Sequence, residues 1–302
     1  MRVLENIRIL SLALNLPGPA ALIRCRAMGA ICVKLEPPAR NGVSSDPMAA
    51  YAPDAYAALH DGVLHVRADL KTAEGQAILQ TELAQADVLI TSFRPSALKK
   101  LGLEWPSLQV RFPRLSLVAI VGSPETIDGQ GAETPGHDLT YLAENGLVTG
   151  LELPPTLYAD MAGALMASEA VLQAVLHRAL HGTGIRIEVA LSEAARHLAL
   201  PRHWGLTQPA GAVGGAHAGY RVYPCLDGRV AIAALEPHFA SRLCEIAGLD
   251  ATAAQTMFRS STHAAIAAFV AVLDCDALDA LAQSHDLPLH TMRNIGRKER
   301  DR

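Results

Sequence analysis

The first 122 residues alternate short β-type runs with helical runs, and this order constrains the fold more than any other feature of the chain. The β-type runs, rich in aliphatic residues and continued by one more run later in the chain, are 7–13, 31–36, 64–70, 87–93, 115–122 and 185–191. Pro17 and Pro19 suit a turn and the first turn of the first helix, which Gly29 ends. Such alternation predicts an α/β fold, a parallel sheet with helices on its faces.

The chain changes character after Pro201. Residues 207–219 form a Gly/Ala-rich loop with room for close backbone approach, and Gly214 and Gly215 within it are candidates for a substrate pocket. Two β-rich runs around Asp227-Gly228 then predict a hairpin, followed by helical segments and a charged, unpatterned tail. We therefore expect a large domain over 1–200 and a smaller α/β domain with a disordered tail over 201–302.

Composition and charge argue against several classes of protein. No stretch approaches the roughly 18 uninterrupted apolar residues of a membrane span, and the N-terminus shows no signal-peptide pattern, so we expect a cytoplasmic protein with no membrane partner. The net charge of −4 gives no support for a nucleic-acid surface. The first turn reads NLPGP rather than G-x-G-x-x-G, so no dinucleotide cofactor is inferred.

Cysteine and histidine spacings do not predict a metal site. The five cysteines form no C-x-x-C pair, which favours reduced, buried thiols over a disulfide framework. His177 and His181 are four residues apart on a predicted helix, a spacing that could face one metal. They lack a third ligand nearby and precede a Gly-Thr-Gly stop, so we interpret them as a solvated helix end and expect no metal.

Asp160 is the first candidate for chemistry. It stands between an extended, proline-containing segment and a strongly apolar helix, at or near the N-cap of that helix. It can be a cap that accepts backbone N–H bonds, and those groups and the helix dipole would hold its carboxylate ionised. The small residues 162–164 leave space beside it, which a nucleophilic or proton-transferring carboxylate needs. Both interpretations stay open.

His137 and Glu236 are the second and third candidates. His137 lies in "PGHDLTY", before Asp138, the more obvious cap of the helix that follows, so it is either a surface histidine or a general acid or base. Glu236 ends the apolar strand of the hairpin, and Pro237 turns the chain after it. A charge in that position is either a boundary residue or a site residue at a strand end.

Six stretches, taken in order, resemble the class III CoA-transferase family of the CaiB/BaiF type, which includes formyl-CoA transferase, carnitine CoA-transferase and α-methylacyl-CoA racemase. The stretches span almost the whole chain: "NLPGPAALIRCRAMGAICVKLEPP", "RADLKTAEGQAIL", "ADVLITSFRPSALKKLGL", "PGHDLTYLAENGL", "LYADMAGALMA" and "GYRVYPCLDGRVAIAALEPHF". The resemblance implies a Rossmann-like large domain, a smaller α/β domain and an interlocked homodimer. It also implies acyl-CoA and a carboxylic acid as substrates, with no tightly bound cofactor.

The resemblance also implies roles for single residues. In the transferases, the residue matching Asp160 attacks the acyl-CoA thioester, and an enzyme-CoA thioester then passes CoA to an acceptor acid. In the racemases, the residues matching His137 and Asp160 stand on opposite faces of the α-carbon, and Glu236 matches a supporting acid. Pro17 and Gly18 fall in the opening motif and are expected to line the substrate pocket with the glycines of the later loop.

The segment that carries cations for the CoA phosphates in the family departs from the family pattern. It reads "HDGVLHVRADLK" in place of an N-R-x-K-R-like stretch, and Val63 and Leu64 cannot bind phosphate. The remaining cationic candidates for CoA binding are Arg94, Lys34, Lys71 and Arg67. Three hypotheses follow: a CoA-transferase using Asp160, a racemase-like enzyme using His137 and Asp160, and a non-catalytic acyl-CoA-binding paralogue.

Overall fold

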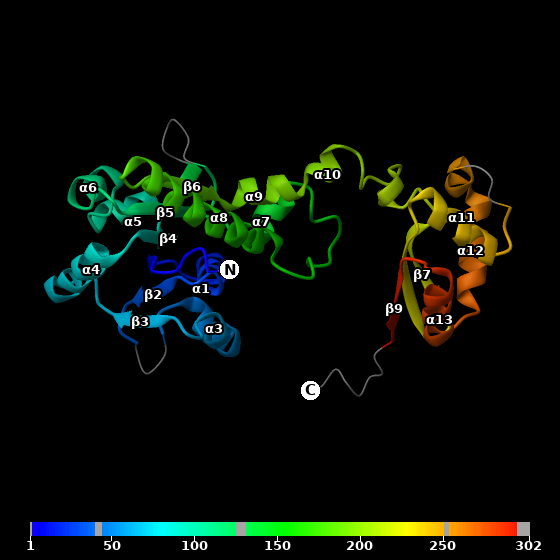
Figure 1. Ribbon diagram of the computed structural model, residues 1–302, viewed down its shortest axis with the longest axis horizontal. Coiled ribbons are helices and arrows are strands. Elements are labelled where there is room, and N and C mark those ends of the chain that lie inside the picture. The colour runs from blue at the N-terminus through cyan, green and yellow to red at the C-terminus, as the bar shows by residue number, and fades with distance from the viewer. Residues whose placement is uncertain (1, 40–43, 125–130, 251–253, 295–302) are drawn as a thin grey trace. The chain divides into compact units, whose positions relative to one another are not determined.

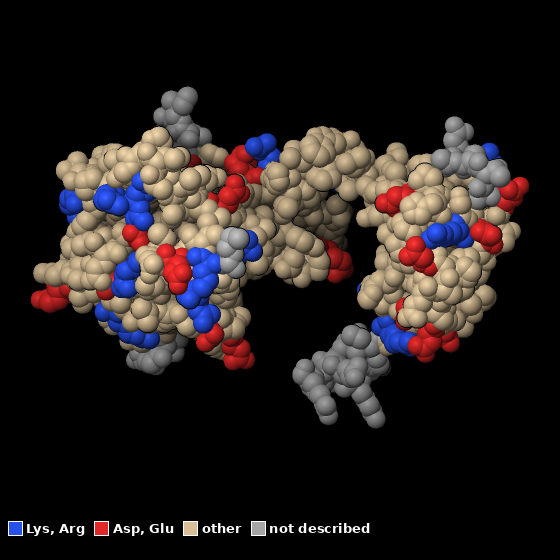
Figure 2. Space-filling view, viewed as in Figure 1, with Lys and Arg blue, Asp and Glu red and all other residues tan. Residues whose placement is uncertain are grey.

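The chain divides into two compact units, Met1–Ala199 and Leu200–Arg302. The computed structural model describes residues 2–39, 44–124, 131–250 and 254–294 (Figure 1). Residues 125–130, in the polar segment that the sequence places before Pro135, lie outside the described residues, and so do residues 295–302 of the charged tail. On the face seen in Figure 2, basic and acidic side chains are interspersed on both units.

The larger unit is built on a six-stranded sheet whose strands all run parallel, in the order β3-β2-β1-β4-β5-β6. Its strands are β1 (Arg8–Ser11), β2 (Ile31–Glu36), β3 (Leu64–Arg67), β4 (Val88–Thr91), β5 (Ser116–Val121) and β6 (Arg186–Ala190). Each lies inside a run predicted from the sequence, and the predicted α/β class with a parallel sheet is confirmed. The order reverses between β1 and β4, as in doubly wound folds.

Helices cover both faces of this sheet, because successive strand residues point to opposite sides. Ile9 packs into the cluster that α1 and α8 complete, whereas Leu10 packs into the cluster that α4, α5 and α6 complete. The helices of the larger unit are α1 (Pro17–Ala27), α2 (Pro47–Tyr51), α3 (Pro53–Leu59), α4 (Ala73–Gln85), α5 (Pro95–Lys100), α6 (Trp105–Arg111), α7 (Asp138–Glu144), α8 (Tyr158–His181) and α9 (Leu191–Leu198).

Local signals account for where several of these helices begin and end. Pro17 occupies the first turn of α1, and the Thr72 hydroxyl accepts the Gly75 N–H at 3.0 Å to cap α4. Gly182 takes the left-handed conformation with φ of 76° and stops α8. By length and composition alone α8 could cross a membrane, but its buried face packs against α1 and α9, as in the core helix of a globular unit.

The smaller unit pairs an antiparallel sheet, in the order β7-β8-β9, with three main helices. Its elements are α10 (Leu200–His203), β7 (Tyr220–Cys225), β8 (Gly228–Ala233), α11 (Pro237–Ile246), α12 (Ser260–Ala271), α13 (Cys275–His285) and β9 (Leu289–Arg293). The predicted hairpin is present, with Cys225 opposite Gly228, so the two turn residues are Leu226 and Asp227. Sequence reasoning missed β9, a short strand that begins where the last helical pattern ended.

Candidate active site

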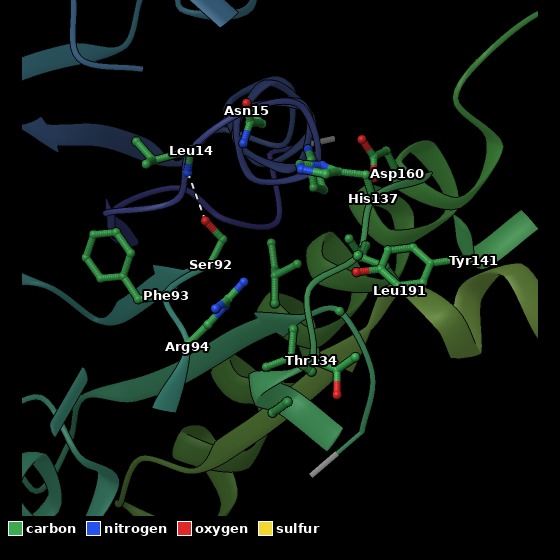
Figure 3. A pocket seen from close by; sticks show the side chains of 16 residues that line it. Leu14, Asn15, Ser92, Phe93, Arg94, Thr134, His137, Tyr141, Asp160 and Leu191 are labelled. Atoms are coloured by element: carbon green, nitrogen blue, oxygen red, sulfur yellow. Dashed lines mark hydrogen bonds between the residues drawn. The ribbon is translucent and has the colours of Figure 1, made fainter. Parts of the chain in front are cut away.

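A cavity of about 160 Å³ lies in the larger unit, beyond the carboxyl ends of β1, β4 and β5 (Figure 3). Leu14 follows β1, Ser92 follows β4, and Gly122 follows β5, and all three line it. The Leu14 N–H donates to the Ser92 Oγ at 3.0 Å, which joins the two loops at the point where the strand order reverses. Ligands of doubly wound sheets bind at this position.

Asp160 lines this cavity from the first turn of α8. The residue at the N-cap is Leu157, so Asp160 lies near the N-cap, as expected, but does not occupy it. The expectation of a firmly ionised carboxylate is corrected. Burial raises the pKa of Asp160 to about 7, and the nearby Asp138 adds to the rise. Burial and a like charge therefore outweigh the helix dipole at this carboxyl.

Asp138 is the first residue of α7 and is buried. Its Oδ1 accepts the backbone N–H of Asp160 at 3.0 Å, so it satisfies one of the free donors at the start of α8. The sequence suggested that Asp138 caps its own helix, but His137 occupies that position. The two helix starts are thus held together through one carboxylate.

His137 lines the same cavity as Asp160 (Figure 3). Its backbone is fixed by Thr140, whose Oγ1 accepts the His137 N–H at 3.0 Å and donates to the His137 carbonyl at 2.7 Å. Its side chain is exposed, whereas the neighbouring Asp138 is buried. The arrangement holds the backbone of His137 at the cavity and leaves the imidazole open to solvent and to a substrate.

Tyr141 is a cavity residue that sequence reasoning missed. Its side chain is buried, and its pKa is raised by burial and by Asp160, while Arg94 lowers it. A Cβ on Gly122 or Gly136 would come within 2.3 or 2.5 Å of its hydroxyl, so both glycines leave room for the ring. The available signal was its place four residues after His137, in the first turns of the helix that His137 caps.

The opening motif and Arg94 supply further walls. Pro17 lines the cavity, whereas Gly18 is not among the described residues that line it. A Cβ on Gly18 would lie 2.2 Å from the Ala13 Cβ. Gly18 therefore permits close packing of α1 against the turn after β1. Arg94 is an exposed residue at the N-cap of α5 and brings a cation to the cavity wall.

Lys34 is not at the surface, which corrects its assignment as a CoA contact. Its side chain is fully buried, and its Nζ donates to the Asp46 Oδ2 at 2.9 Å and to the Ala13 carbonyl at 2.7 Å. An ammonium held in this way supports the turn after β1. Of the other two cations, Arg67 is half-exposed, with its Nη2 3.7 Å from the Glu36 Oε1, and Lys71 is exposed just before α4.

The remaining predicted site residues belong to the smaller unit. Glu236 is the exposed N-cap of α11. Gly214 and Gly215 end a short 3-10 helix within the loop before β7, and Gly215 lines a groove of about 640 Å³ with Arg221 and His263. The described residues that line the cavity around Asp160 all belong to the larger unit.

The family model of CoA-transferase family III matches residues 4–301. Succinate–glutarate CoA-transferase of Agrobacterium fabrum is 29% identical over 276 residues, which cover 83% of this chain and 68% of the relative. The α-methylacyl-CoA racemase of Mus musculus is 28% identical over 264 residues, 82% of this chain and 65% of the relative.

Among solved structures, a CaiB/BaiF family protein from Brucella suis is similar with a TM-score of 0.78 at 24% identity, over 97% of this chain and 84% of that one. At this level of sequence identity the similarity shows that the two proteins share a fold, and it shows no more than that. Several curated relatives are considerably longer than this chain, which spans about half of their length, 51% and 52% in two cases.

Proposed function

This chain belongs to CoA-transferase family III, and on that basis we propose that it moves coenzyme A from an acyl-CoA thioester to a carboxylic acid. The observation that carries the proposal is the placement of Asp160. It is the only carboxyl side chain among the described residues that line the cavity at the strand ends. A transferase of this kind needs one accessible carboxylate, and the pKa of about 7 leaves a share of Asp160 ionised at neutral pH.

The proposed chemistry uses that carboxylate as the nucleophile. Asp160 attacks the thioester carbonyl and expels CoA as the thiolate, which leaves an acyl-aspartyl anhydride. The thiolate then attacks the aspartyl carbonyl, releasing the first acid and forming an enzyme-CoA thioester. The acceptor acid's carboxylate attacks this thioester, expelling the thiolate and forming a second anhydride. The thiolate then attacks the acceptor's carbonyl, which gives the new acyl-CoA and frees Asp160.

The size of the cavity limits what this part of the site holds. Drug-sized ligands occupy pockets of roughly 300–1,000 Å³, so a cavity of about 160 Å³ takes the reacting end of an acyl-CoA rather than the whole molecule. We propose that the phosphates lie outside it on the larger unit, with Arg94, Arg67 and Lys71 as contacts. In this proposal Met1–Ala199 is the CoA-binding domain.

A racemase-like activity is the second candidate, because His137 lines the same cavity as Asp160. In that reaction one of the two residues removes the α-proton of a 2-methylacyl-CoA and the other returns a proton on the opposite face. A carboxyl with a pKa near 7 suits proton transfer at neutral pH as well as it suits attack on a carbonyl. The third candidate is a non-catalytic paralogue that binds acyl-CoA.

One pair of experiments separates these outcomes. The protein is incubated with succinyl-CoA and glutarate, the acids in the name of one relative, and separately with a 2-methylacyl-CoA in deuterated water. Transfer is supported by new glutaryl-CoA and by hydroxylamine trapping of an acyl or CoA adduct on Asp160. Racemisation is supported by α-deuterium exchange without an acceptor acid. Binding of CoA by calorimetry with neither signal supports the non-catalytic paralogue.

Variants assign the roles. Asp160→Asn is expected to abolish both activities, because the amide neither attacks a thioester nor carries the proton. His137→Ala is expected to abolish α-proton exchange and to retain much of any transfer activity. Transfer that persists in Asp160→Asn would contradict the nucleophile assignment.

We further propose a homodimer and a cytoplasmic location. Support for a dimer comes from α8, which exposes large apolar side chains such as Leu165, Leu176 and Leu180. Support for the cytoplasm comes from the five cysteines, none of which is in a disulfide, since thiols persist in reducing compartments.

A further inference from the structure

Two thiols face each other in the smaller unit, whereas the residues described as lining the cavity around Asp160 belong to the larger unit. Cys225 ends β7 and Cys275 is the first residue of α13, and their Sγ atoms are 3.8 Å apart. Cys275 is fully buried, whereas Cys225 is partly exposed. We propose that these two cysteines form a reversible disulfide when the protein meets a low-molecular-weight disulfide oxidant. The inference does not depend on the proposed function.

The two backbones around the thiols are already held together. Asp227, in the turn between β7 and β8, accepts the backbone N–H of Cys275 through its Oδ1 at 2.8 Å. The Leu226 N–H donates to the Leu273 carbonyl at 2.9 Å, so the turn and the start of α13 are joined at two points. A disulfide bond is about 2.05 Å long, so the two sulfurs, now 3.8 Å apart, must approach each other by less than about 2 Å to form it.

A metal ion is the competing use of this cluster. One ligand atom each from Cys225, Asp227 and Cys275 lies within 4.8 Å of the others. The carboxylate of Asp227 is already engaged on both oxygens, by the Cys275 N–H and by the Arg293 Nη1 at 3.1 Å. A cation would have to displace Arg293 or bind beside its guanidinium. The geometry therefore favours a bond between the sulfurs over a bound cation.

The exposure of the two thiols gives the order of steps. The Cys225 thiolate attacks an external disulfide such as oxidised glutathione, forming a mixed disulfide and releasing one glutathione thiolate. Cys275 loses its proton and attacks the Cys225 sulfur, which closes the internal bond and releases the second glutathione. Two protein thiols are oxidised and one oxidant disulfide is reduced. The pKa of Cys275 is raised to about 12, first by its hydrogen bond with Asp227, so the second step is the slow one.

The test is disulfide mapping on the whole folded protein. After incubation with oxidised glutathione, the protein is unfolded in excess N-ethylmaleimide, digested and analysed by mass spectrometry. We expect one 225–275 linked peptide pair, two fewer alkylated cysteines, and Cys25, Cys32 and Cys244 alkylated. Dithiothreitol added before unfolding should restore all five alkylated sites.

Two variants and one binding measurement complete the test. Cys225→Ser should abolish the link and leave Cys275 alkylatable, whereas the matched control Cys244→Ser, another thiol of the same unit, should retain it. Mapping of the unmodified chain keeps the result readable even if a variant fails to fold. Five alkylated cysteines after oxidation, or a mixture of pairings equal to that of the unfolded protein, would overturn the proposal. So would stoichiometric Zn²⁺ in native mass spectra that protects both thiols from the oxidant.

Discussion

Asp160 shows how opposing effects are decided at a single residue. Its place in the first turn of α8 favours the carboxylate, by an effect worth about 0.3–1 kcal/mol at typical helix ends. Burial and the charge of Asp138 act in the other direction and raise its pKa from 3.8 to about 7. Each unit of pKa corresponds to about 1.4 kcal/mol, so the raising effects are the larger ones. The carboxyl is therefore poised between its two protonation states near neutral pH.

The first prediction concerns Asp138→Asn. The amide oxygen can still accept the Asp160 N–H, but the negative charge is lost, so the pKa of Asp160 falls. Activity that requires ionised Asp160 rises with pH through this pKa, and the rising limb should therefore move to lower pH. Because burial is the larger cause, the limb should stay above the ordinary carboxyl pKa of about 4. The pH profile of kcat/KM measures the shift.

A second variant separates charge from position. Asp138→Ala removes both the charge and the acceptor, so it should lower kcat as well as move the limb, by freeing the start of α8. An unchanged limb in Asp138→Asn would show that Asp138 acts on Asp160 only through the hydrogen bond.

At the scale of elements, the turn before α7 makes a tight contact with a side chain of that helix, and this contact sets where the helix starts. A Cβ on Gly136 would lie 2.5 Å from the ring of Tyr141, which is buried and has little freedom to move. The turn before α7 therefore needs a residue without a side chain. This contact, together with the Thr140 bonds, determines where the backbone of His137 lies.

The next prediction follows from that contact. Gly136→Ala should destabilise the protein by about 1–3 kcal/mol, because either the ring or the turn must shift. It should also reduce any reaction that uses His137 more than it reduces CoA binding. Thermal unfolding and α-deuterium exchange measure the two effects.

Gly150→Ala is the matched control for this prediction. Gly150 lies in the segment between α7 and α8, and a Cβ there would meet no atom within 4 Å. Its variant should behave as the unmodified protein does. Equal loss of stability in both variants would show that the ring contact is not the cause.

At the scale of the whole molecule, α8 is unusual in the distribution of its side chains. Its buried face is built from small residues such as Ala159, Gly163 and Ala167, while its exposed face carries larger apolar side chains. The exposed set recurs at helical spacing and comprises Tyr158, Met161, Leu165, Leu176 and Leu180. Exposed apolar side chains aligned on one helix face are typical of interaction surfaces, and they support the proposed dimer.

The whole-molecule prediction is that Leu176→Glu weakens self-association at least about tenfold, because a charge would be buried in the interface. Sedimentation equilibrium of the variant and of the unmodified chain measures the dissociation constants. Val110→Glu is the control, since Val110 is 82% exposed on α6, away from the stripe. A dimer unaffected by Leu176→Glu would place the interface elsewhere.

The sequence by itself determined the six strands of the larger unit, their parallel sheet and the family. These depend on local periodicity, on caps such as Thr72, and on motifs whose order along the chain is readable without coordinates. Family membership is confirmed by the match over 4–301, and Asp160 and His137 were found because they lie in such motifs. Residue roles within the site remain proposals.

Only the tertiary structure decided which polar groups are buried and what they face. The sequence predicts Lys34 to be a free cation, but its strand buries it against Asp46, and only the fold places the ring of Tyr141 at the cavity. The pKa of Asp160 likewise depends on Asp138, which is 22 residues away in sequence. Burial and charge pairing arise from contacts between segments that are distant in sequence, so local sequence patterns do not predict them.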